Sequence, residues 1–195
     1  MAQDKPDFSA LVGSRICHDL ISPIGAIGNG LELMRLTGQG DTPEIALISA
    51  SAGDASARIR FYRIAFGQGG RGQKVANGEL RPLLAALSEG ARVRLRCQHD
   101  GDVARDELRA VFLAMMCVES ALPRGGTVTM RASGGRWVIA AADCPAPPKP
   151  WAELAGEGLT PGPGQVEFAL LPQVVADLGR QLSIAQPEGG LEISF

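Results

Sequence analysis

The chain has 195 residues, a hydrophobic fraction of 45% and a formal net charge of −2. This length can bury one or two small cores. The basic residues are dispersed instead of forming a basic run, which argues against nucleic acid as a partner. The four cysteines show no CxxC pattern and no Cys/His spacing typical of metal sites. A zinc site and a disulfide scaffold are therefore not expected.

The N-terminal stretch MAQDKPDFSA has neither the charge pattern nor the apolar run of a signal peptide. No apolar run reaches the roughly 18 residues that a membrane-spanning helix needs. Free thiols are typical of a reducing compartment. We therefore expect a cytoplasmic protein without membrane association.

Residues 9–66 carry the pattern of two long helices. In the first, apolar residues recur every three or four positions, which predicts one apolar stripe: Ile16, Leu20, Ile24, Ile27, Leu31 and Met34. The second opens with Thr42 as a predicted N-cap and Pro43 at the first helical position. Its apolar residues alternate in steps of three and four, as in a heptad seam: Ile45, Ile48, Ala52, Ala55, Ile59, Tyr62 and Phe66. Gly67 fits as its end.

The link between the two predicted helices, TGQGD, is short, so the helices should lie antiparallel as a hairpin. Two helices alone bury little apolar surface. We expect a homodimer in which two hairpins form a four-helix bundle. The alternative is a hairpin that packs on its own downstream domain.

The glycine-rich residues 67–78 read as a flexible linker. Beyond them the pattern predicts helices near 79–88, 105–121 and 166–178, and strands near 91–98, 127–132, 136–143, 181–185 and 191–195. Residues 144–164 are rich in Pro and Gly and have no periodicity. Residues 79–195 should therefore form an α+β domain with helices on one face of a mixed or antiparallel sheet.

The stretch SRICHDLISPIGAIGNG, residues 14–30, breaks several helix rules within the first predicted helix. His18 lies about 160° around the helix from both Ile16 and Leu20, so it faces away from the apolar stripe. At helical spacing beside it come small or polar residues: Arg15, Ser22, Gly25 and Asn29. Pro23 removes one helical hydrogen bond and should bend the helix one turn past His18. Such a concentration of unfavourable residues marks a candidate functional site, although His18 could also be a simple solvated residue.

The motif HDLISP resembles the phosphoacceptor box of two-component histidine kinases, whose dimerisation domain is a helical hairpin that dimerises into a four-helix bundle. The longer run RICHDLISPIGAIGNGLELM is similar to the ChpT-type bacterial histidine phosphotransferases. The resemblance implies two domains. The first is a dimerisation and phosphotransfer hairpin over residues 9–66. The second, residues 79–195, is an α+β sandwich that resembles a degenerate Bergerat-type ATP-binding domain of histidine kinases.

The nucleotide motifs of that ATP-binding fold are altered in this chain. Anchored on the PRGG turn, Leu113 and Cys117 occupy the positions of two asparagines that would surround Mg²⁺ and phosphate. Neither side chain suits Mg²⁺, which requires oxygen ligands. Asp143 remains from the D-x-G-x-G motif, but Pro145 and Pro147 replace its glycines. We expect no ATP binding, no cofactor and no metal site in this chain.

The resemblance implies that His18 accepts a phosphoryl group from a receiver-domain aspartate of a hybrid cell-cycle histidine kinase. His18 would then pass the group to the receiver aspartate of a response regulator such as a CtrA-type protein. Mg²⁺ would belong to the receiver, not to this chain. Asp19 would support the imidazole. Arg15 would neutralise phosphoryl charge, or be merely solvated.

The other residues of the stretch would serve receiver docking. Ser22 and Gly25 would form the docking surface, and Pro23 would set the bend that admits a receiver. Two further hypotheses stay open: a divergent ATP-dependent histidine kinase fragment, and a non-catalytic receiver-docking scaffold or phosphatase cofactor. A Cys17–His18 thiol catalyst lacks a third orienting group. His99 is expected to be a surface residue.

Overall fold

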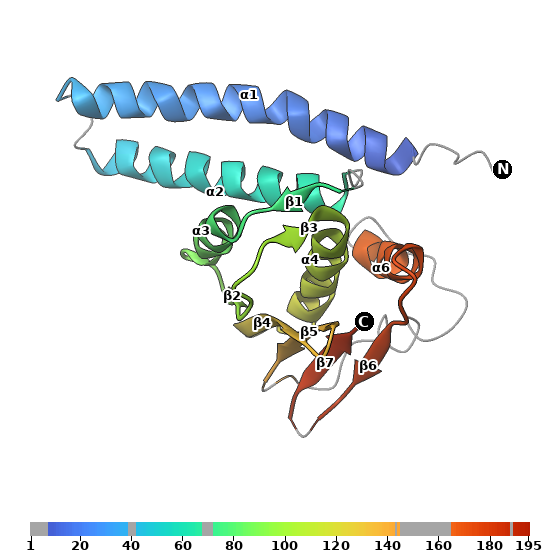
Figure 1. Ribbon diagram of the computed structural model, residues 1–195. Helices are drawn as coiled ribbons and strands as arrows, with labels where there is room; N and C mark the ends of the chain where they lie inside the picture. Colours follow the sequence, from blue (N-terminus) through green and yellow to red (C-terminus); the bar gives the residue numbers. More distant parts are fainter. Residues whose placement is uncertain (1–7, 39–41, 68–71, 143, 145–164, 188) are drawn as a thin grey trace. The chain divides into compact units, whose positions relative to one another are not determined.

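The computed structural model describes residues 8–38, 42–67, 72–142, 144, 165–187 and 189–195, with only the backbone for residues 8–12 and 14. The chain forms two compact units, Met1–Gln68 and Gly69–Phe195, which we describe one at a time (Figure 1). Three residues of the predicted nucleotide motif, Asp143, Pro145 and Pro147, lie outside the described residues.

The first unit is a helical hairpin of α1 (Phe8–Leu36) and α2 (Pro43–Ala65), which run side by side (Figure 1). Both predicted helices are confirmed. The hydroxyl of Thr42 accepts a hydrogen bond from the backbone N–H of Ile45 at 3.3 Å, so Thr42 is the N-cap of α2. Pro43 follows at the first helical position, where its missing N–H costs nothing.

Helix α1 continues through Pro23 without a break. A proline inside a helix removes one backbone hydrogen bond and crowds the preceding turn. The thirteen residues of α1 that follow Pro23 nevertheless stay helical. The local cost of Pro23 is therefore offset by the rest of the hairpin, and the bend expected there stays a prediction.

The hairpin leaves much of the predicted apolar stripe exposed. Leu31 is buried, but Ile16 is 54% exposed, and Leu20 and Ile27 are each 46% exposed. In α2, Ile48 is also 49% exposed. One neighbouring helix can cover only one side of such a stripe, so the hairpin by itself does not satisfy its own apolar pattern.

The second unit begins earlier than the sequence suggests. Lys74–Val75 form a short strand, β1, which pairs antiparallel with β3 (Val103–Ala104). Helix α3 (Asn77–Ser88) follows directly. The predicted linker over residues 67–78 is therefore too long. Val75 and Val103 are both buried, and this small apolar contact fixes a segment whose glycine content favoured a flexible chain.

The remaining elements of the second unit follow the predicted order. They are β2 (Val93–Cys97), α4 (Arg105–Ser120), β4 (Gly126–Ser133), β5 (Arg136–Ala141), α6 (Val166–Asp177), β6 (Ser183–Ala185) and β7 (Leu191–Ser194). Five strands form one sheet in the order β2-β4-β5-β7-β6. The β2–β4 pair is parallel and the other pairs are antiparallel, so the sheet is mixed.

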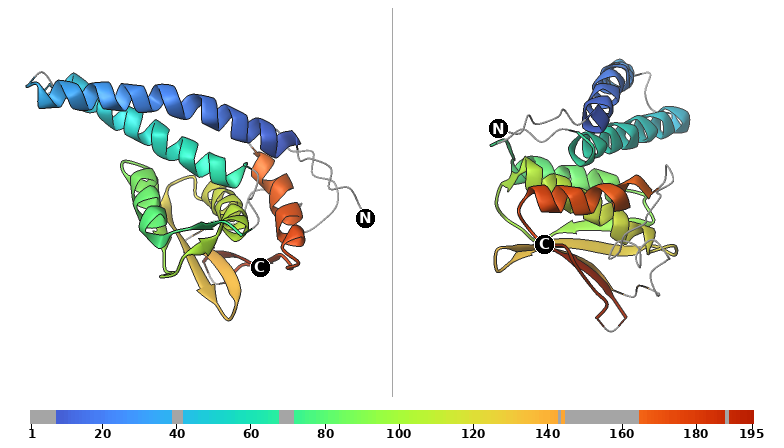
Figure 2. Two further views of the ribbon diagram at one scale, coloured as in Figure 1. Left: turned by 45° about the horizontal axis from the view of Figure 1, so that its top comes forward. Right: turned by 90° about the vertical axis from the view of Figure 1, so that its right-hand side faces the viewer.

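Helices α3, α4 and α6 lie on one face of this sheet (Figure 2). Helix α4 is central: its Phe112, Leu113 and Met115 are at most 1% exposed. The fold is therefore the predicted α+β arrangement, with its core between α4 and the sheet. Among the described helices, none is both long and apolar enough to cross a membrane.

The PRGG turn that leads into β4 requires a glycine at position 125. Gly125 has a φ of +88°, in the left-handed region. A Cβ at this position would also lie 2.5 Å from the backbone oxygen of Arg92. Conformation and space both require glycine here, and the turn thereby brings the start of β4 beside β2.

Candidate functional site

His18 lies on the exposed side of α1, as predicted. Its side chain is 78% exposed, and its Nδ1 lies 3.3 Å from Oδ1 of Asp19. Adjacent helical residues point about 100° apart, so this contact depends on the Asp19 side chain turning toward the ring. The carboxylate contacts Nδ1, and Nε2 has no hydrogen-bond partner among the described residues.

Arg15 holds the same carboxylate from one turn earlier. Its Nε donates a hydrogen bond to Oδ2 of Asp19 at 2.8 Å. The hydrogen bond from Arg15, followed by the one with His18, lowers the pKa of Asp19 below its ordinary value. Asp19 is therefore an ionised carboxylate at neutral pH and can only accept hydrogen bonds. In this contact Nδ1 of His18 is the donor, and in a neutral ring with the proton on Nδ1 the lone pair is on Nε2.

The predicted docking residues are exposed and contact no other site residue through a side-chain hydrogen bond. Ser22, Pro23 and Gly25 all lie on the accessible surface of α1. A Cβ added at Gly25, Gly28 or Gly30 would meet nothing within 4 Å. The packing of the hairpin therefore does not require these glycines, and their helix-weakening effect has no explanation within the hairpin.

Cys17 does not share the accessibility of its neighbour His18. It is 7% exposed, and burial raises the pKa of its thiol, an effect that the charge of Arg63 reduces only in part. A buried neutral thiol is a poor nucleophile. The arrangement therefore gives no support to Cys17 as a reactive group, while it leaves His18 open to a partner.

The altered nucleotide motif of the second unit is packed with side chains. Leu113 and Cys117 of α4 are fully buried. Glu167 of α6 is 7% exposed, and burial raises its pKa, with the charge of Glu119 raising it further. The charge of Glu167 in turn adds to the burial that raises the pKa of Cys117. A buried acid beside Cys117 was not predicted, because a single Glu at a helix start resembles an ordinary dipole-stabilising residue.

His99 belongs to a packed cluster and not to an open surface. Its ring stacks edge-on against Trp137, with the ring centroids 5.1 Å apart. The indole Nε1 of Trp137 donates to Oε2 of Glu107 at 3.1 Å, and Arg180 pairs with the other oxygen of Glu107. His99 is half-buried, so it lies at the surface only in part. Its neighbour Trp137, large and apolar, supplies the packing that covers it.

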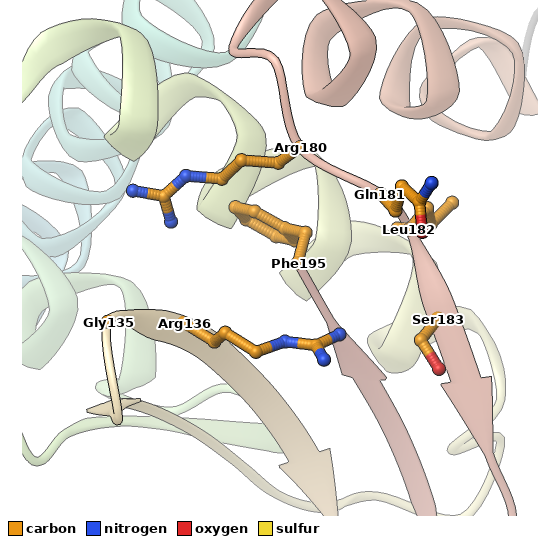
Figure 3. A pocket seen from close by; sticks show the side chains of 7 residues that line it. All are labelled: Gly135, Arg136, Arg180, Gln181, Leu182, Ser183 and Phe195. Carbon is orange, nitrogen blue, oxygen red and sulfur yellow. The ribbon is translucent and has the colours of Figure 1, made fainter.

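A cavity of about 550 Å³ lies at one end of the sheet (Figure 3). Two of its lining residues are Arg136 and Arg180, whose side chains extend in different directions in Figure 3. Arg180 pairs with Glu107, and Arg136 donates to the hydroxyl of Ser194 at 3.2 Å. The two guanidinium groups therefore do not converge on one ligand position.

Comparison with known proteins connects this geometry to a family. Residues 77–190 match the family described as "Histidine phosphotransferase C-terminal domain". The chain is 38% identical over 138 residues to a protein of Brucella abortus (strain 2308) named "Protein phosphotransferase ChpT". That alignment covers 66% of this chain and 62% of the Brucella protein, so the match spans somewhat less than two thirds of the relative.

Two solved structures align with this chain over most of its length. The structure described as "1.7 Angstrom Structure of a Bacterial Phosphotransferase" aligns with a TM-score of 0.66 and 25% identity, over 100% of this chain and 98% of that one. A histidine kinase domain from Erythrobacter litoralis EL346 aligns over 89% of this chain and 93% of that chain, with a TM-score of 0.48 and 15% identity. The match over residues 77–190 covers more than half of the chain, and the chain therefore belongs to the histidine phosphotransferase family.

Proposed function

We propose that this protein relays phosphoryl groups between receiver domains through a phosphohistidine at His18. The observation that supports the proposal is the pair of contacts by which Arg15 and His18 approach the carboxylate of Asp19. In the proposal, this ionised carboxylate holds the proton on Nδ1 and leaves Nε2 exposed. An exposed neutral imidazole nitrogen is the acceptor that transfer from an acyl phosphate requires.

The transfer step follows from this geometry. The lone pair of Nε2 attacks the phosphorus of a receiver aspartyl phosphate, an Nε2–P bond forms, and the P–O bond to the aspartate breaks. The receiver aspartate leaves as a carboxylate. The phosphorylated ring carries positive charge with its proton still on Nδ1, and the nearby Asp19 carboxylate stabilises that charge. Attack by a second receiver aspartate on the phosphorus reverses the step and regenerates neutral His18.

The partners are receiver domains, of a hybrid histidine kinase on one side and of a response regulator, of CtrA type, on the other. Mg²⁺ bound by the receiver supplies charge stabilisation for the phosphoryl group. Nothing in the hairpin fills the space beside Gly25, Gly28 and Gly30, so a receiver helix can approach α1 closely there. Ser22 adds a small polar contact on the same exposed surface.

We also propose that the relay takes place in the cytoplasm.

Arg15 has two roles in this proposal. Its Nε fixes Asp19, as described. The terminal guanidinium nitrogens have no hydrogen-bond partner in the described part of the chain, and a phosphoryl group on His18 would suit them. Arg15 is thus a positioning residue for Asp19 and a second source of positive charge.

The functional unit is a homodimer. Several large apolar side chains of the hairpin, among them Ile16, Leu20 and Ile27, are about half exposed in a single chain. A second hairpin that covers them would complete a four-helix bundle and bury the stripe on both sides. This arrangement would place a His18 on each subunit.

The protein has no autokinase activity in this proposal. Leu113 and Cys117 are buried in the core and offer no oxygen ligand for Mg²⁺. The buried carboxyl group of Glu167 lies near enough to Cys117 to affect its pKa. The phosphoryl group must therefore come from a receiver.

The direct test is to mix the protein with a receiver domain that carries a radiolabelled phosphoryl group on its aspartate. Wild type should acquire acid-labile label, and His18→Ala should acquire none. His99→Ala is the matched control, because it removes the only other histidine. It should be labelled like wild type.

The same samples distinguish the alternatives. Label taken directly from ATP and Mg²⁺ would make the protein a divergent kinase. A His18→Ala protein that still supports signalling between receivers would make it a docking scaffold or phosphatase cofactor.

A further inference from the structure

One face of the five-stranded sheet carries no helix in the described part of the chain (Figure 2). Side chains alternate across a strand, and the buried ones, such as Val128, Ile139 and Ile193, face the helices. The alternate residues therefore face the opposite side, where the described chain places no helix (Figure 2). We call this side the open face.

Arginines dominate the open face. They are Arg94 and Arg96 of β2, Arg131 of β4 and Arg136 of β5. Among the described strand residues on this face, the one acidic side chain is Glu192 of β7, which pairs with Arg131 at 3.4 Å. The described strands thus place four positive charges and one negative charge on the open face, in a chain whose net charge is −2.

The strand register gathers these charges. Arg94 pairs with Thr127 and Arg96 with Thr129, so each of these arginines has a threonine beside it on the same face of the sheet. Residues two apart on a strand are roughly 7 Å apart and neighbouring strands roughly 5 Å apart. The four arginines therefore span a patch that one extended segment of a partner can cross.

Two of the four arginines have no ion-pair partner among the described residues. Arg136 donates to Ser194 at 3.2 Å and extends along the sheet toward β6 (Figure 3), and Arg131 has Glu192. Arg94 and Arg96 are exposed, and neither has an ion-pair partner among the described residues. Like charges on one face repel one another and destabilise the fold. Stability therefore does not explain why these arginines lie together.

We infer that the open face binds an acidic polypeptide segment of a partner protein. Arginine forms paired hydrogen bonds with carboxylates, and the threonine and serine hydroxyls beside it extend that contact. This site is independent of His18, because it uses the second unit alone.

The chemistry of the face favours a polypeptide over other polyanions. Among the described strand residues that face this side, none is aromatic, so bases of single-stranded nucleic acid would find no stacking surface. None of the large exposed apolar residues lies on it, so it has no means of inserting into a lipid surface.

The test uses the full-length chain and a fluorescent peptide of alternating Glu and Ser, followed by anisotropy. A peptide of alternating Lys and Ser, an oligonucleotide of equal negative charge and vesicles with anionic lipid serve as comparison probes. The double variant Arg94→Thr/Arg96→Thr removes the two unpaired charges and keeps residues that favour a strand. Lys74→Thr/Arg35→Gln is the matched control, because it removes two exposed charges elsewhere.

The acidic peptide should bind wild type and the control equally, and the Arg94→Thr/Arg96→Thr variant about tenfold more weakly. Binding should also weaken between about 50 mM and about 300 mM salt. Equal loss in both variants would overturn the inference, because binding would then follow net charge alone. Tighter binding of the oligonucleotide or the vesicles, or no binding of the acidic peptide, would overturn it as well.

Discussion

At the scale of single residues, the candidate site consists of one exposed histidine and the two side chains of Arg15 and Asp19 beside it. Arg15 and His18 approach the Asp19 carboxylate at different oxygens, and both hydrogen bonds lower its pKa. The pair Arg58–Asp54 of α2 has the same spacing and an Nε–Oδ2 distance of 2.9 Å, but no histidine beside it. Asp54 is therefore a control for the effect of the Asp19 carboxylate on His18.

Replacing Asp19 should slow phosphotransfer. Asp19→Asn removes the charge that fixes the Nδ1 proton and stabilises the phosphorylated ring, and we expect the transfer rate to fall about 10²-fold. Asp54→Asn removes an equivalent surface ion pair and should leave the rate unchanged. Rapid-quench measurement of label on His18 checks both variants. Equal rates for wild type and Asp19→Asn would show that Asp19 has no role in the step.

A substitution at Gly25 should change stability and function in opposite directions. Gly25→Ala should raise the free energy of unfolding by up to about 1 kcal/mol, because the added methyl group meets nothing within the hairpin. The same methyl group would obstruct a docked receiver, so the KM for the phosphorylated receiver should rise. Gly53→Ala in α2, whose Cβ also meets nothing, should give the stability gain alone. Urea unfolding and transfer kinetics measure the two effects; an unchanged KM in Gly25→Ala would contradict the docking surface.

At the scale of elements, two helix pairs determine the behaviour of the chain. The α1–α2 hairpin leaves its apolar stripe half exposed, which favours association with a second hairpin. The α4–α6 pair instead buries an acid, Glu167, beside Cys117. The first pair thus leaves apolar surface exposed, whereas the second pair buries an acidic side chain.

Ile27 tests the hairpin interface. Ile27→Glu places a charge on the stripe, and burying an unpaired carboxylate is costly, so the dimer Kd should rise about a hundredfold or more. Leu33→Glu alters a residue that is 62% exposed and lies off the stripe, so it should leave the dimer intact. Sedimentation equilibrium gives both values. A monomeric wild type at micromolar concentration would refute the bundle.

Glu167 makes stability depend on pH. Burial raises its pKa in the folded protein above the ordinary value, so folding favours the protonated acid. Its stabilising effect is complete below the ordinary pKa and is lost as pH rises through the raised pKa. The unfolding free energy of wild type should therefore fall relative to that of Glu167→Gln as pH rises from about 4 to about 8. Parallel urea titrations of both proteins measure the difference, and a pH-independent difference would contradict the buried acid.

At the scale of the whole molecule, the chain joins the hairpin that carries His18 to a second unit, and in our proposal that second unit binds no nucleotide. The prediction is that no heat is released when Mg²⁺-ATP is titrated into the protein at up to about 1 mM, a range that detects even weak sites. Saturable nucleotide binding would contradict the assignment of the second unit.

Periodicity predicted the long elements well, because each buries a regular apolar face: both helices of the hairpin, α4 and the strands of the main sheet. It missed β1 and β3, whose two residues each are too short to carry a period. The position of His18 followed from the helical repeat. Its contact with Asp19 did not, because adjacent helical residues diverge and the contact depends on side-chain rotation. The burial of Glu167 depends on how α6 packs on α4, which no local pattern records.

The measurement that tests the central claim most directly is a two-receiver relay. A labelled, Asp-phosphorylated receiver is mixed with a second, unlabelled receiver, with wild type, His18→Ala or no added protein. We predict that label reaches the second receiver only with wild type, through a transient acid-labile species on this chain. Label that reaches the second receiver equally well with His18→Ala would contradict transfer through His18.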